Sequence, residues 1–83
     1  MQVPSIGRDV HYVSYGTPGG EYASACRAAK ISEVDSLDAH HVGLVVLNPT
    51  GLFFHSLSDG GCHFDLLGRR AGGSWHWPER AGD

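Results

Sequence analysis

The sequence lacks the features that define several common classes of small protein. It has only two cysteines, Cys26 and Cys62, without C-x-x-C spacing, which argues against a disulfide framework or a zinc ribbon. Its best apolar runs, residues 42–47 and 52–54, are far shorter than the ~20 residues of a membrane span. The N-terminus has neither a basic start nor an apolar stretch of signal-peptide length. We therefore expect a soluble, cytoplasmic protein that does not enter a membrane.

Basic charge is also scarce. The formal net charge is −3, with six lysines and arginines against nine acidic residues. A general nucleic-acid binder carries a strongly basic face, so this class of function is not expected, although one or two arginines could serve a local site. A chain of 83 residues buries only about 60% of its unfolded surface and forms one small domain. We place this domain at residues 1–78, with a C-terminal tail at residues 79–83.

Glycine and proline, in contrast, are plentiful, with 12 and four residues, and they divide the chain into short segments typical of β-proteins. Residues 26–34 have two interpretations. The three alanines from Ala25 to Ala29 favour a helix. The alternation of Ala29 and Ile31 with polar neighbours favours a strand. We predict a strand. The predicted strands are residues 9–15, 26–34, 41–47, 52–57 and 74–78, with residues 62–67 as a further short candidate.

Five short strands without a long helix predict an all-β fold. A small SH3-like barrel is the simplest architecture, because closure of the sheet removes its exposed edges. An OB-like barrel is the alternative. Residues 48–51 (Asn-Pro-Thr-Gly) are expected to form the turn of a hairpin, since proline presets one backbone angle and glycine tolerates positive φ.

Both tryptophans of the chain stand in one tripeptide, Trp75-His76-Trp77. In a strand, alternation sends both indoles to one face and His76 to the other. One interpretation is that a ring fills the core, because a small core needs large residues. The other is that both rings form a stacking surface for a base, a proline-rich peptide or a second subunit. We expect Trp75 to be partly structural and Trp77 to be exposed and functional.

Other candidate ligand-binding residues lie at loop ends and on strands. Tyr15 and Tyr22 flank a Gly-Thr-Pro-Gly-Gly loop, whose glycines could bring backbone N–H groups close to a phosphate. Arg27 stands among alanines and either faces solvent or binds phosphate or carboxylate. His55 and His76 could donate hydrogen bonds in a pocket. The predicted ligand-binding residues are Tyr15, Tyr22, Arg27, Asn48, Thr50, His55, Trp75, His76 and Trp77.

Neither metal binding nor catalysis is predicted. The six histidines show no H-x-x-x-H or H-x-H spacing. Cys62, His63 and His55 could supply metal ligands, but adjacent residues rarely chelate one tetrahedral ion. Serine and aspartate residues follow His55, yet no elbow motif frames a nucleophile. We therefore expect a protein that is not an enzyme and that uses no metal or cofactor.

The stretches HYVSYGTPGGEY, CRAA, NPTGLFFH and GGSWHWPE carry a resemblance to a family. Together they resemble a group of small proteins of actinobacteria and their phages, which open with Pro-Ser-x-Gly-x-x-Val-His-Tyr and close with Gly-x-Trp-His-Trp-Pro-Glu. The resemblance covers most of the chain and implies no particular activity. Where those proteins have a short connection before the closing motif, this chain has residues 58–71, so the role of this segment is not implied.

The expected function is binding. At the level of class, the chain is similar to small β-rich phage proteins that neutralise bacterial defence by sequestering nucleotide second messengers. The prediction is a non-enzymatic, phage-type protein that holds a nucleotide-like ligand between aromatic rings and arginines in the host cytoplasm. The alternative is a module that docks on a host or phage protein through its tryptophan face. Both interpretations include a homo-oligomer, because a short chain can build a deep pocket at a subunit interface.

Overall fold

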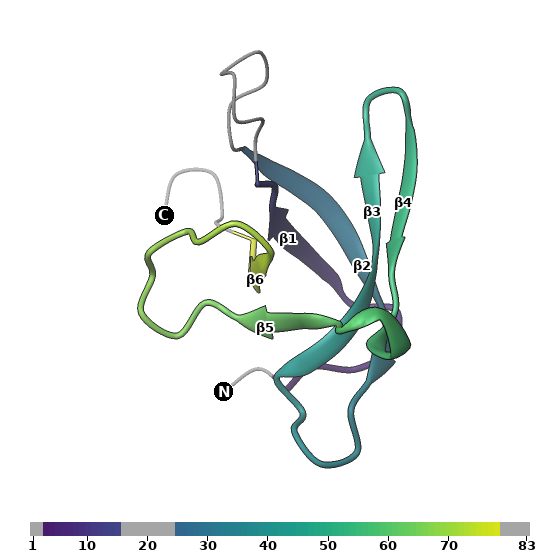
Figure 1. Cartoon of the computed structure of the whole chain (residues 1–83), viewed down its shortest axis with the longest axis vertical. Coiled ribbons are helices and arrows are strands. Elements are labelled where there is room, and N and C mark those ends of the chain that lie inside the picture. The colour runs from purple at the N-terminus through teal and green to yellow at the C-terminus, as the bar shows by residue number, and fades with distance from the viewer. Residues whose placement is uncertain (1–2, 16–24, 79–83) are drawn as a thin grey trace.

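The computed structural model describes residues 3–15 and 25–78, and regular structure in these ranges is almost entirely β-strand (Figure 1). The helical part of this region is one 3-10 turn, η1 (Leu57–Asp59). No helix in the described ranges has the length and apolar character needed to cross a membrane. The strands are β1 (Asp9–Val13), β2 (Cys26–Val34), β3 (His41–Asn48), β4 (Gly51–His55), β5 (Cys62–Phe64) and β6 (Ser74–His76).

Five of the strands form a closed barrel. The order of hydrogen-bonded neighbours is β2-β1-β6-β5-β3, and β3 pairs again with β2 to close the ring. Neighbours are antiparallel except for β5 and β6, which are parallel. β4 lies outside the ring and, among the described strands, pairs only with β3, as part of a long hairpin that extends away from β5 and β6 (Figure 1). The predicted all-β, SH3-like or OB-like small barrel is confirmed.

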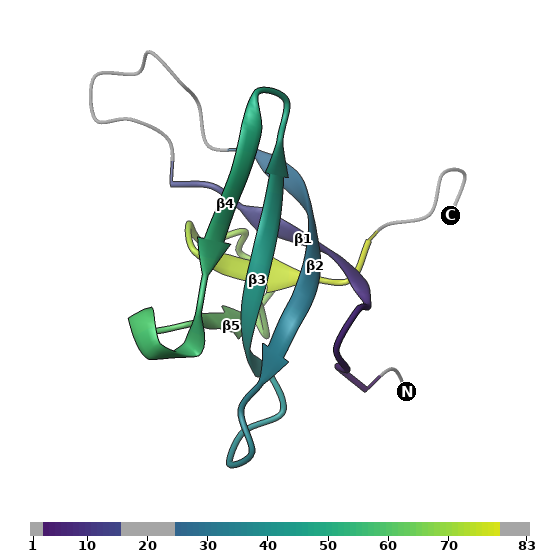
Figure 2. The same cartoon turned by 90° about the vertical axis from the view of Figure 1, so that its right-hand side faces the viewer.

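Closure depends on β2, the longest strand, because it pairs with β1 along one edge and with β3 along the other (Figure 2). A bulge between Ile31 and Glu33 shifts its register with β3, and bulges bend strands. Gly43 is the partner of Glu33 at this bend. A Cβ at Gly43 would come within 2.8 Å of the Glu33 carboxylate and 3.2 Å of the His55 carbonyl oxygen, so a side chain here would displace the Glu33 carboxylate and crowd the β4 backbone.

Alternation along the strands fills the barrel interior. On β1, Val10 and Tyr12 are buried while Asp9 is exposed, and the same period of two recurs on the other long strands. The prediction of strand over helix for residues 26–34 is confirmed, because Ala29 and Ile31 point inward from β2. The core consists of Val10, Tyr12, Ala29, Ile31, Val42, Leu44, Val46, Cys62 and Trp75.

Trp75 is the largest of these side chains and has no exposed surface. Its indole N–H donates a 2.9 Å hydrogen bond to the carbonyl oxygen of His40, which satisfies the one polar atom of the ring. Phe64 meets the ring edge-on at a centroid distance of 4.9 Å, and Trp77 does so at 5.2 Å. The strand β6 therefore contributes the centre of the core.

Several strands are shorter than the sequence predicts. β1 ends at Val13 rather than at residue 15, and the backbone N–H of Ala25 then bonds to the Ser14 hydroxyl. β4 ends at His55 because Ser56 caps η1, accepting a hydrogen bond from the Asp59 N–H. The candidate strand at 62–67 is real but ends at Phe64, and the last strand ends at His76 rather than at residue 78.

A histidine joins the β2–β3 turn to η1. One ring nitrogen of His41 lies 2.9 Å from the Asp35 carboxylate, and the other lies 2.6 Å from the carbonyl oxygen of Gly60. Both partners are acceptors, so the ring satisfies both only as an imidazolium that donates twice. The hydrogen bond that His41 donates to Asp35, followed by the one it donates to the Gly60 carbonyl oxygen, raises the pKa of His41, and the same hydrogen bond lowers the pKa of Asp35. The ring of His63 stacks on His41 at 4.3 Å.

We predict that replacing Trp75 abolishes folding whereas replacing Trp77 does not. Trp75→Ala should cost about 3–5 kcal/mol, which is comparable with the ~5 kcal/mol available to a small domain. Trp77 is only half-buried, so Trp77→Ala should keep a cooperative thermal transition. Circular dichroism melting curves of both variants measure this difference. Equal melting temperatures for the two variants would contradict the packing described here.

A second prediction concerns pH. Because the pKa of His41 is raised, its stabilising contribution is present below pH ~6.5 and is lost as the pH rises through the folded-state pKa. The contribution of Asp35, whose pKa is lowered, is present above pH ~4 and is lost as the pH falls. Asp35→Asn should lower the pKa of His41, as followed by NMR titration of the imidazole. Asp38→Asn is the control and should produce a smaller decrease, because Asp38 acts only through space. An unchanged His41 pKa in Asp35→Asn would be inconsistent with this arrangement.

Candidate functional site

A pocket of about 220 Å³ lies where β1, β3 and β4 come together at the inner face of the sheet. Its floor includes Tyr12, whose ring stacks on that of His55 with centroids 4.9 Å apart and planes 28° apart. Burial raises the pKa of Tyr12 to about 12, so its hydroxyl stays protonated and neutral at physiological pH. The pocket is lined by Tyr12, Ser14, Val46, Asn48, Phe53 and His55.

Arg27 lies beside this pocket. It is the register partner of Tyr12 across β1 and β2, and it shares the inward face of β2 with Ala29. Ala28 pairs with Leu47, so Arg27 and Asn48 are the next residues along the two strands. The Nε–H group of Arg27 is buried, and it has no hydrogen-bond partner within residues 3–15 and 25–78. A buried donor without a partner is costly, so this N–H is suited to an incoming acceptor.

Two of the predicted ligand-binding residues, Asn48 and His55, line the pocket, and Arg27 lies beside it at the register position next to Asn48 without being a lining residue. Arg27 faces inward, which excludes the interpretation that it is only a solvent-facing charge. Thr50 is exposed in the β3–β4 turn and does not line the pocket. Tyr22 lies outside the described residues. Tyr12 was not among the predicted ligand-binding residues; it is buried in the core and also forms a wall of the pocket.

Tyr15 belongs to a different cavity. Its ring covers the backbone of Gly72 and Gly73, and a Cβ at either glycine would collide with the ring. Gly73 also has a φ of +88°, so the Gly-Gly pair before β6 is required by both backbone geometry and close approach. The cavity beside Tyr15 has a volume of about 480 Å³ and is lined mainly by β5 and the loop that follows it, including Phe64, Leu66 and Arg69.

The tryptophans do not form a stacking surface. Trp75 is completely buried, so its assignment as a ligand-binding residue is wrong, and the interpretation as a core residue is correct for this ring. The two indoles meet at 86°, edge to face, and Trp77 packs against the core while remaining half-buried. The guanidinium carbon of Arg8 lies 4.8 Å from the centroid of the Trp77 ring, a cation–π contact.

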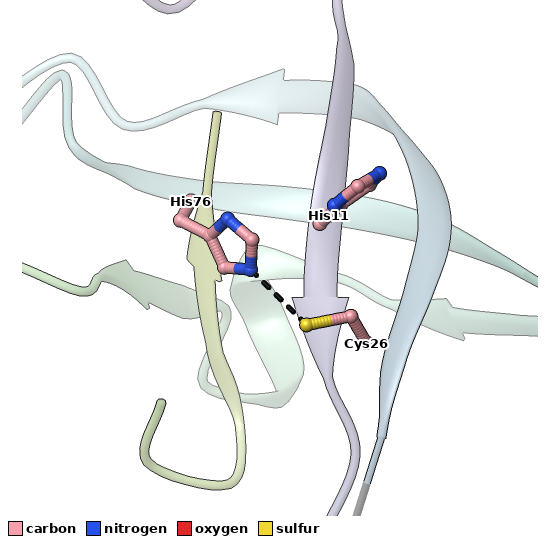
Figure 3. Close-up of side chains that lie close together, drawn as sticks. All are labelled: His11, Cys26 and His76. Atoms are coloured by element: carbon pink, nitrogen blue, oxygen red, sulfur yellow. Dashed lines mark hydrogen bonds between the residues drawn. The ribbon is translucent and has the colours of Figure 1, made fainter. Parts of the chain in front are cut away.

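His76 faces the outside of the barrel, as alternation predicts, and meets two other side chains there. It is the register partner of His11 on β1, and the two imidazoles contact edge to face at 5.3 Å. Cys26 at the start of β2 places its Sγ 3.3 Å from Nε2 of His76. Figure 3 shows the thiol and the imidazole of His76 pointing toward one another across β1, which carries His11. The potential ligand atoms of the three residues all lie within 4.8 Å of one another.

One hydrogen bond of His76 fixes the orientation of its ring. Nδ1 lies 2.9 Å from the carbonyl oxygen of Trp77, an acceptor, so Nδ1 carries a proton. Nε2, the other ring nitrogen, is the atom that faces Cys26. This cluster cannot be found from local spacing in the sequence, because residues 11, 26 and 76 are far apart in the chain. Alternation places His11 and His76 on the outer face, but only the strand order β2-β1-β6 makes them neighbours.

The second cysteine does not belong to a comparable cluster among the described residues. Cys62 is buried in the core, and burial raises the pKa of its thiol to about 11. A thiol of this kind remains protonated and unreactive. Cys62, His63 and His55, which were considered above only as possible metal ligands, do not converge, because His55 stacks on Tyr12 whereas His63 stacks on His41.

The outer strand β4 exposes an unusual amount of apolar surface. Leu52, Phe53 and Phe54 are 54–70% exposed, and Leu47 of β3 is exposed beside them. Leu52 and Phe54 pair with Leu47 and Val45 on one face of the hairpin, whereas Phe53 lies on the face of the pocket. Because β4 pairs only with β3, one edge of its backbone is not hydrogen-bonded to another described strand.

Comparison with known proteins adds no functional information. No model of a protein family matches the chain. No curated protein matches its sequence, and no solved structure matches its fold.

Proposed function

We propose that the protein binds and sequesters a small anionic ligand with one planar ring, of the nucleotide class, in the pocket beside Arg27. The observation that carries this proposal is the buried Nε–H of Arg27, which has no partner in the described structure and lies next to an aromatic pocket. An arginine binds anionic oxygens such as those of a phosphate strongly, through parallel charge-assisted hydrogen bonds.

The size and walls of the pocket support a ring as the other part of the ligand. A volume of 220 Å³ accommodates one planar ring and is too small to enclose a whole nucleotide. Tyr12, His55 and Phe53 offer aromatic surface, and stacking of a base on such a ring contributes ~1–3 kcal/mol. Asn48 supplies an amide that can both donate and accept at the edge of a base.

The groups around the pocket favour binding over chemistry. Tyr12 is held in its neutral form by burial, and the Ser14 hydroxyl already accepts a hydrogen bond from the Ala25 N–H. A protein of this kind would act by keeping a signalling nucleotide away from its receptor, as the analogy with phage anti-defence proteins implies. The proposal therefore retains the function expected from the sequence and moves its site from the tryptophans to the barrel interior.

We predict that Arg27→Ala weakens nucleotide binding without destabilising the free protein. Loss of a hydrogen bond to a charged group costs about 1.5–3 kcal/mol, which corresponds to an affinity about 10- to 150-fold lower. The unliganded variant should melt at the same temperature or higher, because a buried donor without a partner has been removed. Calorimetric titration should use nucleoside monophosphates and cyclic dinucleotides, with the matched nucleosides and inorganic phosphate as comparisons.

Arg69→Ala is the matched control, because Arg69 lines the separate 480 Å³ cavity. This variant should bind nucleotides as the wild type does. Two results would contradict the proposal: loss of binding in Arg69→Ala with retention in Arg27→Ala, and nucleosides that bind as tightly as their phosphates.

A second candidate function is protein association through β4, and its exposed apolar side chains favour this candidate. An occupant that fits this strand is a second copy of the chain. Two β4 strands can pair antiparallel about a two-fold axis, which satisfies the unpaired edge of each and brings Leu52 and Phe54 beside the apolar side chains of the other copy. The sequence predicted the tryptophan face as the docking surface. Because Trp75 is buried, the exposed side chains of β4 are better suited to contact a partner.

We predict that the protein is a dimer at micromolar concentration and that Phe54→Asp makes it a monomer. A carboxylate at position 54 would replace an apolar cross-strand contact by a charge without a partner beside the apolar side chains of the other copy, which is unfavourable. Leu66→Asp is the control and should remain dimeric, since Leu66 is equally exposed but lies on the β5–β6 loop. Sedimentation velocity distinguishes the two species. A monomeric wild type, or a dimer that persists in Phe54→Asp, would rule out this interface.

A further inference from the structure

We propose that His11, Cys26 and His76 form a binding site for a divalent transition-metal ion of the zinc class on the outer face of the barrel. The three side chains offer two imidazole nitrogens and one thiolate sulfur, which are the ligands that Zn²⁺ prefers. None of the three residues lines either of the two pockets described above, so this site is separate from the proposed ligand site.

The distances suit a metal ion. Bonds of ~2.3 Å to sulfur and ~2.0–2.1 Å to nitrogen place neighbouring tetrahedral ligands about 3.3–3.6 Å apart. Cys26 Sγ and His76 Nε2 are already 3.3 Å apart. The ligand atoms of the whole set lie within 4.8 Å, so a side-chain adjustment of roughly 1 Å is needed to reach tetrahedral spacing.

Three adjacent strands hold the ligands in place. His11 and His76 are direct partners across β1 and β6, and Cys26 is the partner of Val13, two residues beyond His11 on β1. Residues in these direct and diagonal positions face one another on the same side of a sheet. A site on paired strands varies less in geometry than one built on loops, which favours binding of an ion that requires fixed angles.

An outer hydrogen bond completes the arrangement. Ligating histidines commonly donate their second ring nitrogen to a carbonyl or carboxylate, which fixes the tautomer and the ring orientation. His76 does this with the carbonyl oxygen of Trp77, leaving Nε2 directed at the site. Three protein ligands leave the fourth position for water or another ligand, as in open zinc sites rather than closed structural ones.

A reactive thiol is the other chemistry that this geometry suggests, because a thiol beside an imidazole can lose its proton to it. A nucleophilic pair requires only Cys26 and His76. His11 is not needed for that role, yet its ring contacts His76 edge to face and adds the third ligand atom. The metal site accounts for all three residues, and thiol reactivity is therefore an outcome of the test.

The test is titration of the untagged full chain with Co²⁺, a spectroscopic probe for Zn²⁺ sites, in a buffer with a non-ligating reductant. We expect one Co²⁺ per chain with a thiolate-to-metal charge-transfer band, displacement by Zn²⁺, and a higher melting temperature with Zn²⁺. Cys26→Ser should abolish the charge-transfer band. His11→Ala should weaken binding by more than about 100-fold, because even loss of an outer hydrogen-bond partner costs about 10- to 100-fold.

His40→Ala is the matched control, since His40 is an exposed histidine outside the cluster, and the variant should bind Co²⁺ as the wild type does. Cys26 is exposed and His11 is half-buried, so both variants should fold, and loss of binding in the folded variants reflects the site. A charge-transfer band that survives in Cys26→Ser would overturn the proposal. So would an absence of Co²⁺ and Zn²⁺ binding together with unusually fast alkylation of Cys26, which would identify a reactive thiol instead.

Discussion

The pairing of β1 with both β2 and β6 is the constraint on which the rest of the structure depends. It joins the first strand of the chain to the last and fixes Tyr12 opposite Trp75 on the inner side and His11 opposite His76 on the outer side. Because the side-chain period of a strand is two, a slip of one residue would exchange these faces and move Trp75 out of the core. One register therefore determines both the core and the cluster of His11, Cys26 and His76.

Filling the barrel with one large ring limits where function can lie. A domain of this size has little apolar material, and Trp75 occupies the centre with its N–H satisfied by the His40 carbonyl oxygen. Space for a ligand then remains at two places that the core side chains do not fill. One lies beside Tyr12 and Arg27, and the other lies beside Tyr15 and the β5–β6 loop. The cluster of His11, Cys26 and His76 lies on the outer face instead. The small volume of the core therefore determines where these candidate sites lie.

Sequence patterns were sufficient for the strands and the barrel, because alternation and the spacing of glycine and proline are local properties. Alternation also predicts that His76 and Trp75 point to opposite faces of their strand. The strand order is not a local property, because it depends on which distant segments pair. It places Cys26 and His11 next to His76, and it places Arg27 of β2 near Asn48 of β3. Burial of the tryptophans was ambiguous for the same reason, since the ring of strands that encloses Trp75 is assembled from distant parts of the chain.

Hydrogen exchange of the two indole N–H groups tests the central register most directly, since NMR resolves one signal for each tryptophan. The indole N–H of Trp75 is buried and hydrogen-bonded to His40, so it should exchange only through global unfolding, at a rate that falls as the protein is stabilised. The indole N–H of the half-buried Trp77 should exchange much faster, through local fluctuations. Rapid exchange of both signals, or protection of Trp77 with rapid exchange of Trp75, would contradict the register of β6 and the interior and exterior faces that follow from it.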